Sequence, residues 1–252
     1  MLSEFIKTRL LRSESQGIDQ TLITCFAALV AIGFIMITSA TLDYALQVKS
    51  NSFYFTIKHS IYMLFGLFIS IVVSKIKLSF YNDYSKLFLL FAFIISLIIF
   101  IPGFGREING AKRWLDLGFI TIQVSEISRF FIMIWICSFI SKRDVNLSFN
   151  KCLLMVAILC AIILSQRDFG SAALLIFTFF SLMFVAGLHL KKLFYYFTIV
   201  FIISIPLIIY QPYRLKRVIS FMNPWDDPSG SGYQLIASLL AFGKGGFFGL
   251  GL

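Results

Sequence analysis

Seven apolar stretches alternate with short polar or basic segments along the chain. Most of them approach the ~20 residues that an α-helix needs to cross a bilayer. The pattern therefore predicts an all-α, polytopic membrane helix bundle with seven transmembrane helices. The first stretch is expected to be a retained helix, because the apolar core of a cleaved signal peptide has only about 7–15 residues. The predicted spans are residues 21–41, 59–73, 87–101, 120–140, 151–165, 170–188 and 193–210.

The composition supports a membrane setting. Of the 252 residues, 59% are hydrophobic and 13% are charged, and the mean hydropathy is +0.89. A soluble domain has roughly 45–50% apolar and about 25% charged residues. The formal net charge of +10 fits anionic headgroups or a phosphate-bearing ligand. The four cysteines lie in apolar stretches and are expected to be buried small side chains rather than metal ligands or disulfides: Cys25, Cys137, Cys152 and Cys160.

The basic residues give the expected orientation. The 22 Lys and Arg residues divide equally between the two sides if the N-terminus is inside. Because short loops next to spans carry the greater weight, the N-terminus and the turn 142–151 are placed inside. The loops 42–58, 104–119 and 211–252 are then outside, and their positive charge favours an anionic ligand on that side.

The large outer loop 211–252 holds most of the turn-forming residues. Prolines and glycines make 223–232 a run of turns, and 233–242 is predicted to be a short amphipathic helix ended by glycines. Asp226 and Asp227 lie between two prolines, where turn-forming aspartates are common, so each is a weak catalytic candidate. The glycine-rich end lacks the spacing of a phosphate-binding P-loop.

A pair of adjacent cations lies just before the fourth predicted span. Lys112 and Arg113 precede Trp114 in the segment 108–129. One interpretation is a pair that snorkels to the membrane interface beside an interfacial tryptophan. The other is a clamp for a phosphate group, because arginine binds such oxygens bidentately. The residues alone leave both open.

Three charged residues lie within or at the start of predicted spans. Glu126 and Arg129 are three residues apart on one helical face, which fits either an ion pair facing the bundle or a substrate contact. Asp168 precedes the sixth span, where an aspartate can accept hydrogen bonds from free backbone amides. It is therefore expected to cap that helix.

Three segments carry a resemblance to a known family: NGAKRWLDLGFITIQVSE (109–126), QRDFGSA (166–172) and NPWDDPSGSGYQLIASLLAFGKGGFFGLGL (223–252). On these segments the chain resembles the SEDS family (shape, elongation, division and sporulation; FtsW, RodA and SpoVE), which comprises polytopic peptidoglycan glycosyltransferases. The last segment looks like the division-type members. The chain departs from the family pattern at Val124 and Arg167, where the family has proline, and at Arg129, where it has lysine.

The resemblance implies that residues 1–252 are the N-terminal part of a single SEDS membrane domain. Family members have about ten transmembrane helices of ~20 residues each. The aspartate favoured as their catalytic residue follows the glycine-rich segment and would lie beyond Leu252. The catalytic base is therefore left unassigned, with Asp226, Asp227 and Asp168 as weak candidates, and this chain alone is expected to be inactive.

The function implied by the resemblance is polymerisation of lipid II into glycan strands during septal cell-wall synthesis and cell division. An acceptor hydroxyl would attack the anomeric carbon of the donor, and undecaprenyl pyrophosphate would leave. The donor would develop oxocarbenium character, and cations would stabilise the leaving pyrophosphate. The residues expected to bind substrate are Lys112, Arg113, Trp114, Glu126, Arg129, Tyr233 and Gln234.

Two other functions remain open: a lipid II flippase, and a non-catalytic scaffold fragment of the division machinery. The expected partners are lipid II, the membrane, a class B penicillin-binding transpeptidase and other divisome proteins. No nucleic acid is expected, because the basic residues are scattered between spans. No cofactor is evident, and a divalent cation is left open. The expected location is the bacterial inner (cytoplasmic) membrane, at the division septum.

Overall fold

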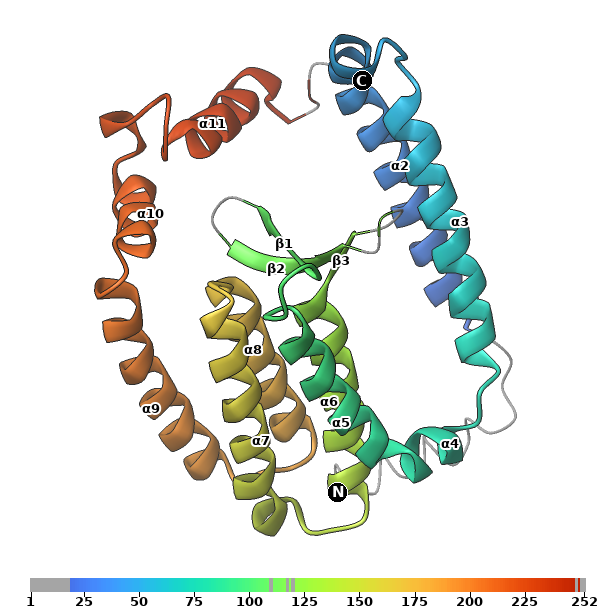
Figure 1. The fold of residues 1–252 in the computed structure, drawn as a ribbon, viewed down its shortest axis with the longest axis vertical. Helices are drawn as coiled ribbons and strands as arrows, with labels where there is room; N and C mark the ends of the chain where they lie inside the picture. Colours follow the sequence, from blue (N-terminus) through green and yellow to red (C-terminus); the bar gives the residue numbers. More distant parts are fainter. Residues whose placement is uncertain (1–18, 109–110, 117, 119–120, 248, 250–252) are drawn as a thin grey trace. The chain divides into compact units, whose positions relative to one another are not determined.

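The computed structural model describes residues 19–108, 111–116, 118, 121–247 and 249. The chain divides into two compact units, each described by itself below. One comprises Met1–Lys75 and Leu240–Leu252, and the other comprises Ile76–Leu239. Helices make up most of the described residues, and a single small sheet accompanies them (Figure 1).

Two long apolar helices build the first unit, α2 (Gln20–Lys49) and α3 (Tyr54–Ser74). Asp19 begins α2 by accepting hydrogen bonds from backbone amides of the first turn, as a helix N-cap does. The two helices pack on each other near their connection, where the rings of Tyr44 and Phe55 stack with centroids 5.6 Å apart.

The prediction of a loop over all of 42–58 is wrong, because only residues 50–53 separate the two helices. Hydropathy falls after residue 41, where Asp43 and Gln47 enter the sequence, yet polar residues continue a helix without difficulty. The helix ends only at Ser50, whose left-handed backbone (φ 53°) donates its amide to the preceding turn. The apolar stretch 21–41 therefore corresponds to only part of α2, and the helix continues beyond it to Lys49.

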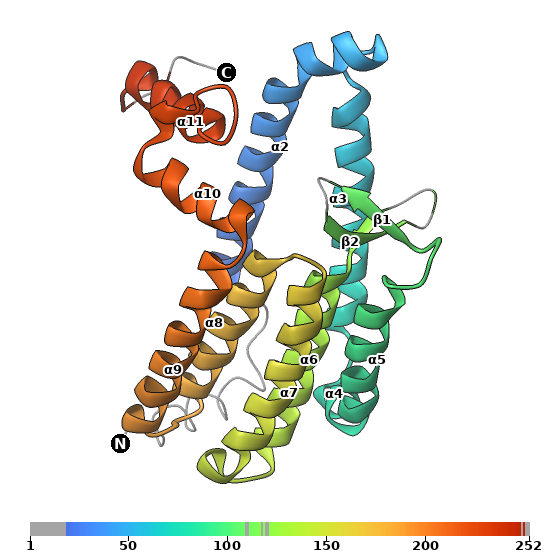
Figure 2. The same cartoon turned by 60° about the vertical axis from the view of Figure 1, so that its left-hand side comes forward.

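Five helices form the main part of the second unit: α5 (Ser85–Ile98), α6 (Val124–Ser141), α7 (Val145–Ser165), α8 (Phe169–Val185) and α9 (Leu190–Ile209). Figures 1 and 2 show α6, α7 and α8 side by side. Their facing sides are apolar and close-packed. The largest fully buried side chains there are Phe149, Phe179, Ile132, Ile136, Leu159, Ile163, Leu175 and Met183.

Each of the seven predicted spans coincides with an apolar helix, which confirms the all-α membrane helix bundle. Among the described residues, five helices are long and apolar enough to cross a membrane: α2, α3, α6, α7 and α9. The other two, α5 and α8, are also apolar but shorter. The chain is a multi-pass membrane protein, and the count of seven crossings stays a prediction.

The cysteines divide between the two environments of such a bundle. Cys152 and Cys160 are buried, as predicted, whereas Cys25 and Cys137 are exposed on helix surfaces. The expectation of burial was wrong for these two, because an apolar sequence position in a membrane helix can face lipid as well as protein. All four are free thiols.

A three-stranded antiparallel sheet precedes α6, consisting of β1 (Gly105–Ile108), β2 (Ala111–Asp116) and β3 (Thr121–Gln123) in the order β1-β2-β3. The prediction of a loop with an amphipathic piece at 104–119 is therefore wrong. The fourth predicted span also starts too early at residue 120, since the chain is a strand until Gln123 and the helix begins at Val124.

The segment 211–252 is more ordered than its composition suggested. A helix that the sequence did not predict, α10 (Pro212–Met222), follows α9 directly. Elsewhere in the chain, the short helix α4 (Leu78–Asp83) was also not predicted. The predicted turns contain a 3₁₀ turn, η2 (Pro224–Asp226). The predicted amphipathic helix is confirmed as α11 (Tyr233–Gly245), although it runs two residues past Gly243. A helix tolerates glycine at a modest cost, so Gly243 alone does not end it.

Candidate functional site

A buried carboxylate lies where β3, α6 and α8 meet. Asp168 is only 4% exposed and caps α8, accepting the Ser171 amide at 3.2 Å, so the predicted capping role is confirmed. Its Oδ2 accepts three further bonds, from Ser171 Oγ at 2.8 Å, Ser125 Oγ at 3.0 Å and Gln123 Nε2 at 3.0 Å. These four residues, Gln123, Ser125, Asp168 and Ser171, are called the Asp168 cluster below.

The cluster keeps its carboxylate ionised. Burial opposes the negative charge of Asp168, but hydrogen bonds from Ser171, Ser125 and Gln123 outweigh burial, and the pKa is lowered from its ordinary value. A carboxylate with a lowered pKa is a weak general base, because a base works best with a pKa near the operating pH. It is instead a fixed negative charge that can orient a cation.

Arg113 forms an ion pair with this carboxylate. Its Nη1 lies 3.8 Å from Asp168 Oδ1, and its side chain is 31% exposed. Strand pairing accounts for its position: Arg106 pairs with Trp114 and Glu107 with Lys112, so Arg113 is the extra residue of a β-bulge. A bulge locally redirects side chains of a strand.

Arg113 retains unused hydrogen-bonding capacity. Its Nε is buried and has no hydrogen-bond partner among the described residues. A guanidinium offers five N–H donors in a planar fork, and a buried donor without a partner is costly. The group is therefore held by the Asp168 carboxylate on one side and can bind further anionic oxygens with its remaining donors.

The structure separates the two cations that the sequence placed together. Lys112 is exposed and lies opposite Glu107 in the sheet, and no contact between Lys112 and the Asp168 cluster is found among the described residues. Trp114 is half-buried and pairs in register with Gln123 of the cluster. Arg113 and Trp114 therefore belong to one site, and Lys112 lies beside it.

Glu126 and Arg129 form the expected ion pair in the first turns of α6. The expectation that both face the bundle is wrong for Glu126, whose side chain is 48% exposed within this chain. The first helical turn is a favourable place for Glu126, because the helix dipole stabilises negative charge there.

Glu126→Gln is expected to lower the free energy of unfolding by about 1 kcal/mol at most, as for other partly exposed ion pairs. Unfolding in mixed micelles, followed by tryptophan fluorescence, measures the change. Arg129→Gln serves as the matched variant and should cost a similar amount. A loss above about 3 kcal/mol for either would mean that the pair behaves as a buried one.

Asp226 and Asp227, the two aspartates between the prolines, differ in their contacts. Asp226 is exposed and accepts one hydrogen bond, from Asn223 Nδ2 at 2.7 Å. Asp227 lies 2.9 Å from Lys216 Nζ of α10 and accepts two bonds from Ser231, one from its amide and one from its hydroxyl, both 3.1 Å long. The Lys216 side chain and the Ser231 bonds lower the pKa of Asp227 to about 2. Asp227 is thus a turn-stabilising carboxylate, and a poor general base.

Protonation of Asp227 is expected to loosen this turn. Since its folded-state pKa is lowered, its stabilising contribution is complete above its unfolded pKa of about 4 and is lost as the pH falls toward about 2. A spin label at the exposed Ser229 should therefore gain mobility at low pH, or at neutral pH in Asp227→Asn. Asp226→Asn, which removes a single exposed contact, is the control. Equal mobility in both variants would contradict this role.

Tyr233 and Gln234, both predicted to bind substrate, lie exposed in the first turn of α11. No contact joins them to the Asp168 cluster among the described residues. Within the part of the chain that the structure describes, no group of three or more His, Cys, Asp or Glu side chains could hold a metal ion.

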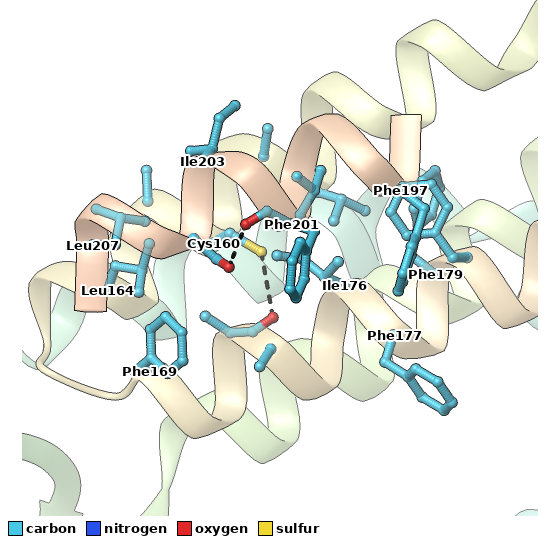
Figure 3. A pocket seen from close by; sticks show the side chains of 18 of the residues that line it. Cys160, Leu164, Phe169, Ile176, Phe177, Phe179, Phe197, Phe201, Ile203 and Leu207 are labelled. Carbon is cyan, nitrogen blue, oxygen red and sulfur yellow. Dashed lines mark hydrogen bonds between the residues drawn. The ribbon is translucent and has the colours of Figure 1, made fainter. Parts of the chain in front are cut away.

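A cavity of about 570 Å³ lies between α7, α8 and α9, and its walls are almost entirely apolar. Figure 3 shows Phe169 and Leu207 at one end and a group of phenylalanines, including Phe179 and Phe197, at the other. Phe169, which lines one end of the cavity, is the residue after Asp168 of the cluster. The cavity is of the size that ligand pockets have, about 300–1,000 Å³.

The sequence of the chain matches a known protein family. A profile for cell cycle proteins, FTSW_RODA_SPOVE, matches residues 19–252. The chain belongs to this family. The resemblance seen in the three sequence segments is thereby confirmed.

Curated relatives agree over nearly the whole chain. The probable peptidoglycan glycosyltransferase FtsW of Coxiella burnetii is 36% identical over 94% of this chain and 65% of its own length. The protein of the same name from Idiomarina loihiensis is 38% identical over 93% of this chain and 58% of its own length. The chain thus spans about three fifths of the length of these relatives.

Solved structures share the fold. A chain from a structure described as "Structural coordination of polymerization and crosslinking by a peptidoglycan synthase complex" matches with a TM-score of 0.71 and 24% identity, covering 89% of this chain and 65% of that one. The rod shape determining protein RodA of Thermus thermophilus matches with a TM-score of 0.62 and 22% identity, covering 75% of this chain and 60% of its own.

Proposed function

We propose that this protein is a peptidoglycan glycosyltransferase that polymerises lipid II into glycan strands during septal cell-wall synthesis. The observation that carries the proposal is the 36–38% identity, over 93–94% of the chain, to proteins named probable peptidoglycan glycosyltransferases. Residues 1–252 are then the N-terminal part of one membrane domain, with the loop 211–252 on the outer side. The inner membrane at the septum would be its location, and a class B penicillin-binding transpeptidase its partner.

The Asp168 cluster supplies the geometric support. In this proposal Arg113 binds a phosphate of the leaving undecaprenyl pyrophosphate, because it combines a positive charge with unused donors beside a fixed carboxylate. Electrostatic stabilisation of a developing charge by a pre-oriented group is typically a large part of enzymatic rate enhancement. Asp168 acts as a positioning residue in this arrangement.

The other predicted site residues take supporting roles in the proposal. Lys112 and Arg129 add positive charge near the phosphates, and Glu126 orients Arg129 through their ion pair. Trp114, Tyr233 and Gln234 contact the sugars. Neither Asp168 nor Asp227 suits the general base, because the pKa of each carboxyl is lowered.

The reaction distinguishes this function from lipid transport. The full-length protein, purified and reconstituted in vesicles with fluorescent lipid II, is expected to yield glycan polymer that lysozyme digests. Accessibility of the lipid II headgroup to an added reagent measures movement across the bilayer in the same sample. Headgroup movement without polymer would replace the glycosyltransferase by a flippase, and neither activity in a well-folded preparation would favour a scaffold.

A further inference from the structure

The amphipathic helix α10 presents its apolar side outward. Leu215, Val218, Ile219 and Met222 recur at helical spacing and form one stripe, called the α10 stripe below. All four are exposed, and Met222 reaches 82%. An amphipathic helix of a water-soluble fold normally turns such a stripe toward the core.

The polar side of α10 is the one that contacts protein. Lys216 Nζ lies 2.9 Å from Asp227, and Ser220 Oγ lies 2.6 Å from Ser231 Oγ. The turn that follows α10 is therefore attached to its polar side. This inverted arrangement leaves the α10 stripe exposed on the described part of the chain, although burial of such a stripe is what ordinarily stabilises a short helix.

The start of α10 is fixed at the end of a membrane helix. Arg214, which is 9% exposed, donates from Nη1 to the Leu207 carbonyl of α9 at 2.7 Å, and its guanidinium lies 5.0 Å from the centre of the Phe169 ring. Figure 2 shows α10 leaving the end of α9 at an angle. Because α9 is long and apolar enough to span a membrane, α10 begins where that span reaches the bilayer boundary.

Aromatic and basic residues around α10 match this boundary. Tyr210 and Trp225, on either side of the helix, are strongly exposed, and such residues concentrate at the headgroup level of membranes. Arg217 is exposed and has neither a hydrogen bond nor an ion pair with the described residues. Arg217 lies on the polar face of α10, away from the stripe. Cations on the polar face of an interfacial amphipathic helix bind anionic headgroup phosphates while its apolar face contacts the acyl chains.

We propose that α10 lies in the bilayer interface, with its stripe in contact with the outer ends of the acyl chains and Arg217 on anionic headgroup phosphates. The lipid surface thereby fixes the position of α10. The contacts of Lys216 with Asp227 and of Ser220 with Ser231 then fix the turn 224–232 relative to α10. The position of α10 favours lipid over a protein partner. Because α10 follows α9 directly, its first residue already lies at the bilayer boundary.

Spin labels can measure the depth of α10 in the whole protein. Single cysteines at Val218 and Met222, in a background lacking the four native cysteines, report on the stripe, and one at the exposed Ser229 serves as the matched control in the turn. The protein is reconstituted in vesicles of phosphatidylethanolamine and phosphatidylglycerol. Collision with oxygen, which concentrates in lipid, is compared with collision with a water-soluble nickel complex.

The expected ratio of oxygen to nickel collisions is several-fold higher at Val218 and Met222 than at Ser229. Nickel access at all three positions would overturn the proposal, and exclusion of both reagents from the stripe would show a protein partner instead. Arg217→Gln should abolish the additional depth that phosphatidylglycerol produces over phosphatidylcholine alone. Unchanged depth in that variant would remove Arg217 from the headgroup contact.

Discussion

Asp168→Ala should lower the free energy of unfolding by about 3 kcal/mol or more. The substitution removes the shared acceptor of Gln123, Ser125 and Ser171. Hydrogen bonds to a charged acceptor contribute roughly 1.5–3 kcal/mol each. Arg113 also loses its counter-charge. Unfolding of the reconstituted protein by denaturant measures the loss.

A second helix cap in the same bundle provides the control. Asp144 caps α7 by accepting the Asn146 and Leu147 amides at 2.8 and 3.1 Å. Within the described part of the chain, no side chain donates a hydrogen bond to Asp144. Asp144→Ala should therefore cost only about 1 kcal/mol, as loss of an N-cap does. If the two alanine variants were equally stable, Asp168 would be a helix cap and nothing more.

Arg113→Ala should weaken binding of lipid II by at least about tenfold. The loss follows from charge-assisted hydrogen bonds worth about 1.5–3 kcal/mol, since about 1.4 kcal/mol corresponds to one factor of ten in affinity. Arg113→Lys should recover only part of the loss, because an ammonium cannot bind two phosphate oxygens in a planar fork. Titration of fluorescent lipid II into the purified full-length protein measures both affinities.

The same sheet offers a control for Arg113. Arg106 lies on β1, is well exposed and pairs with Asp116 at 3.4 Å. Arg106→Ala removes an equal charge from the sheet and is expected to leave lipid II affinity nearly unchanged. Equal losses for the two variants would indicate a general effect of net charge. Lys112→Ala, compared with both, shows whether Lys112 shares in phosphate binding.

The helices were predictable because a membrane span is encoded locally. About 20 apolar residues in sequence have few alternatives to a helix in lipid, where every backbone hydrogen bond must be made internally. Each of the seven predicted spans contains a helix for this reason. Helix ends were less predictable, since Asp43 and Gln47 continue α2 where hydropathy alone would end it.

The sheet and α10 depend on signals that hydropathy does not contain. The strands have only three to six residues, and they are stabilised by pairing across the sheet rather than by their own composition. In α10, the apolar residues alternate with Arg214, Lys216 and Arg217, so the segment has a low average hydropathy. The periodic spacing of its apolar positions was the available signal.

The candidate site was only partly visible in the sequence. Arg113 and Asp168 stood out as charges beside apolar stretches, and the capping role of Asp168 followed from its position before a helix. Ser125 and Ser171 carried no signal of their own, because their hydroxyl contact joins residues 46 positions apart in the chain. The β-bulge that separates Arg113 from Lys112 is likewise a property of strand register, which neighbouring residues do not determine.

The central claim is that Asp168 orients Arg113 toward a phosphate, and a double-mutant cycle on lipid II affinity tests it most directly. Asp168→Asn removes the charge while asparagine remains a good helix cap, and Arg113→Ala removes the cation. If the two residues act as a unit, the double variant will bind lipid II no more weakly than Arg113→Ala alone. Independent losses that multiply in the double variant would contradict the claim.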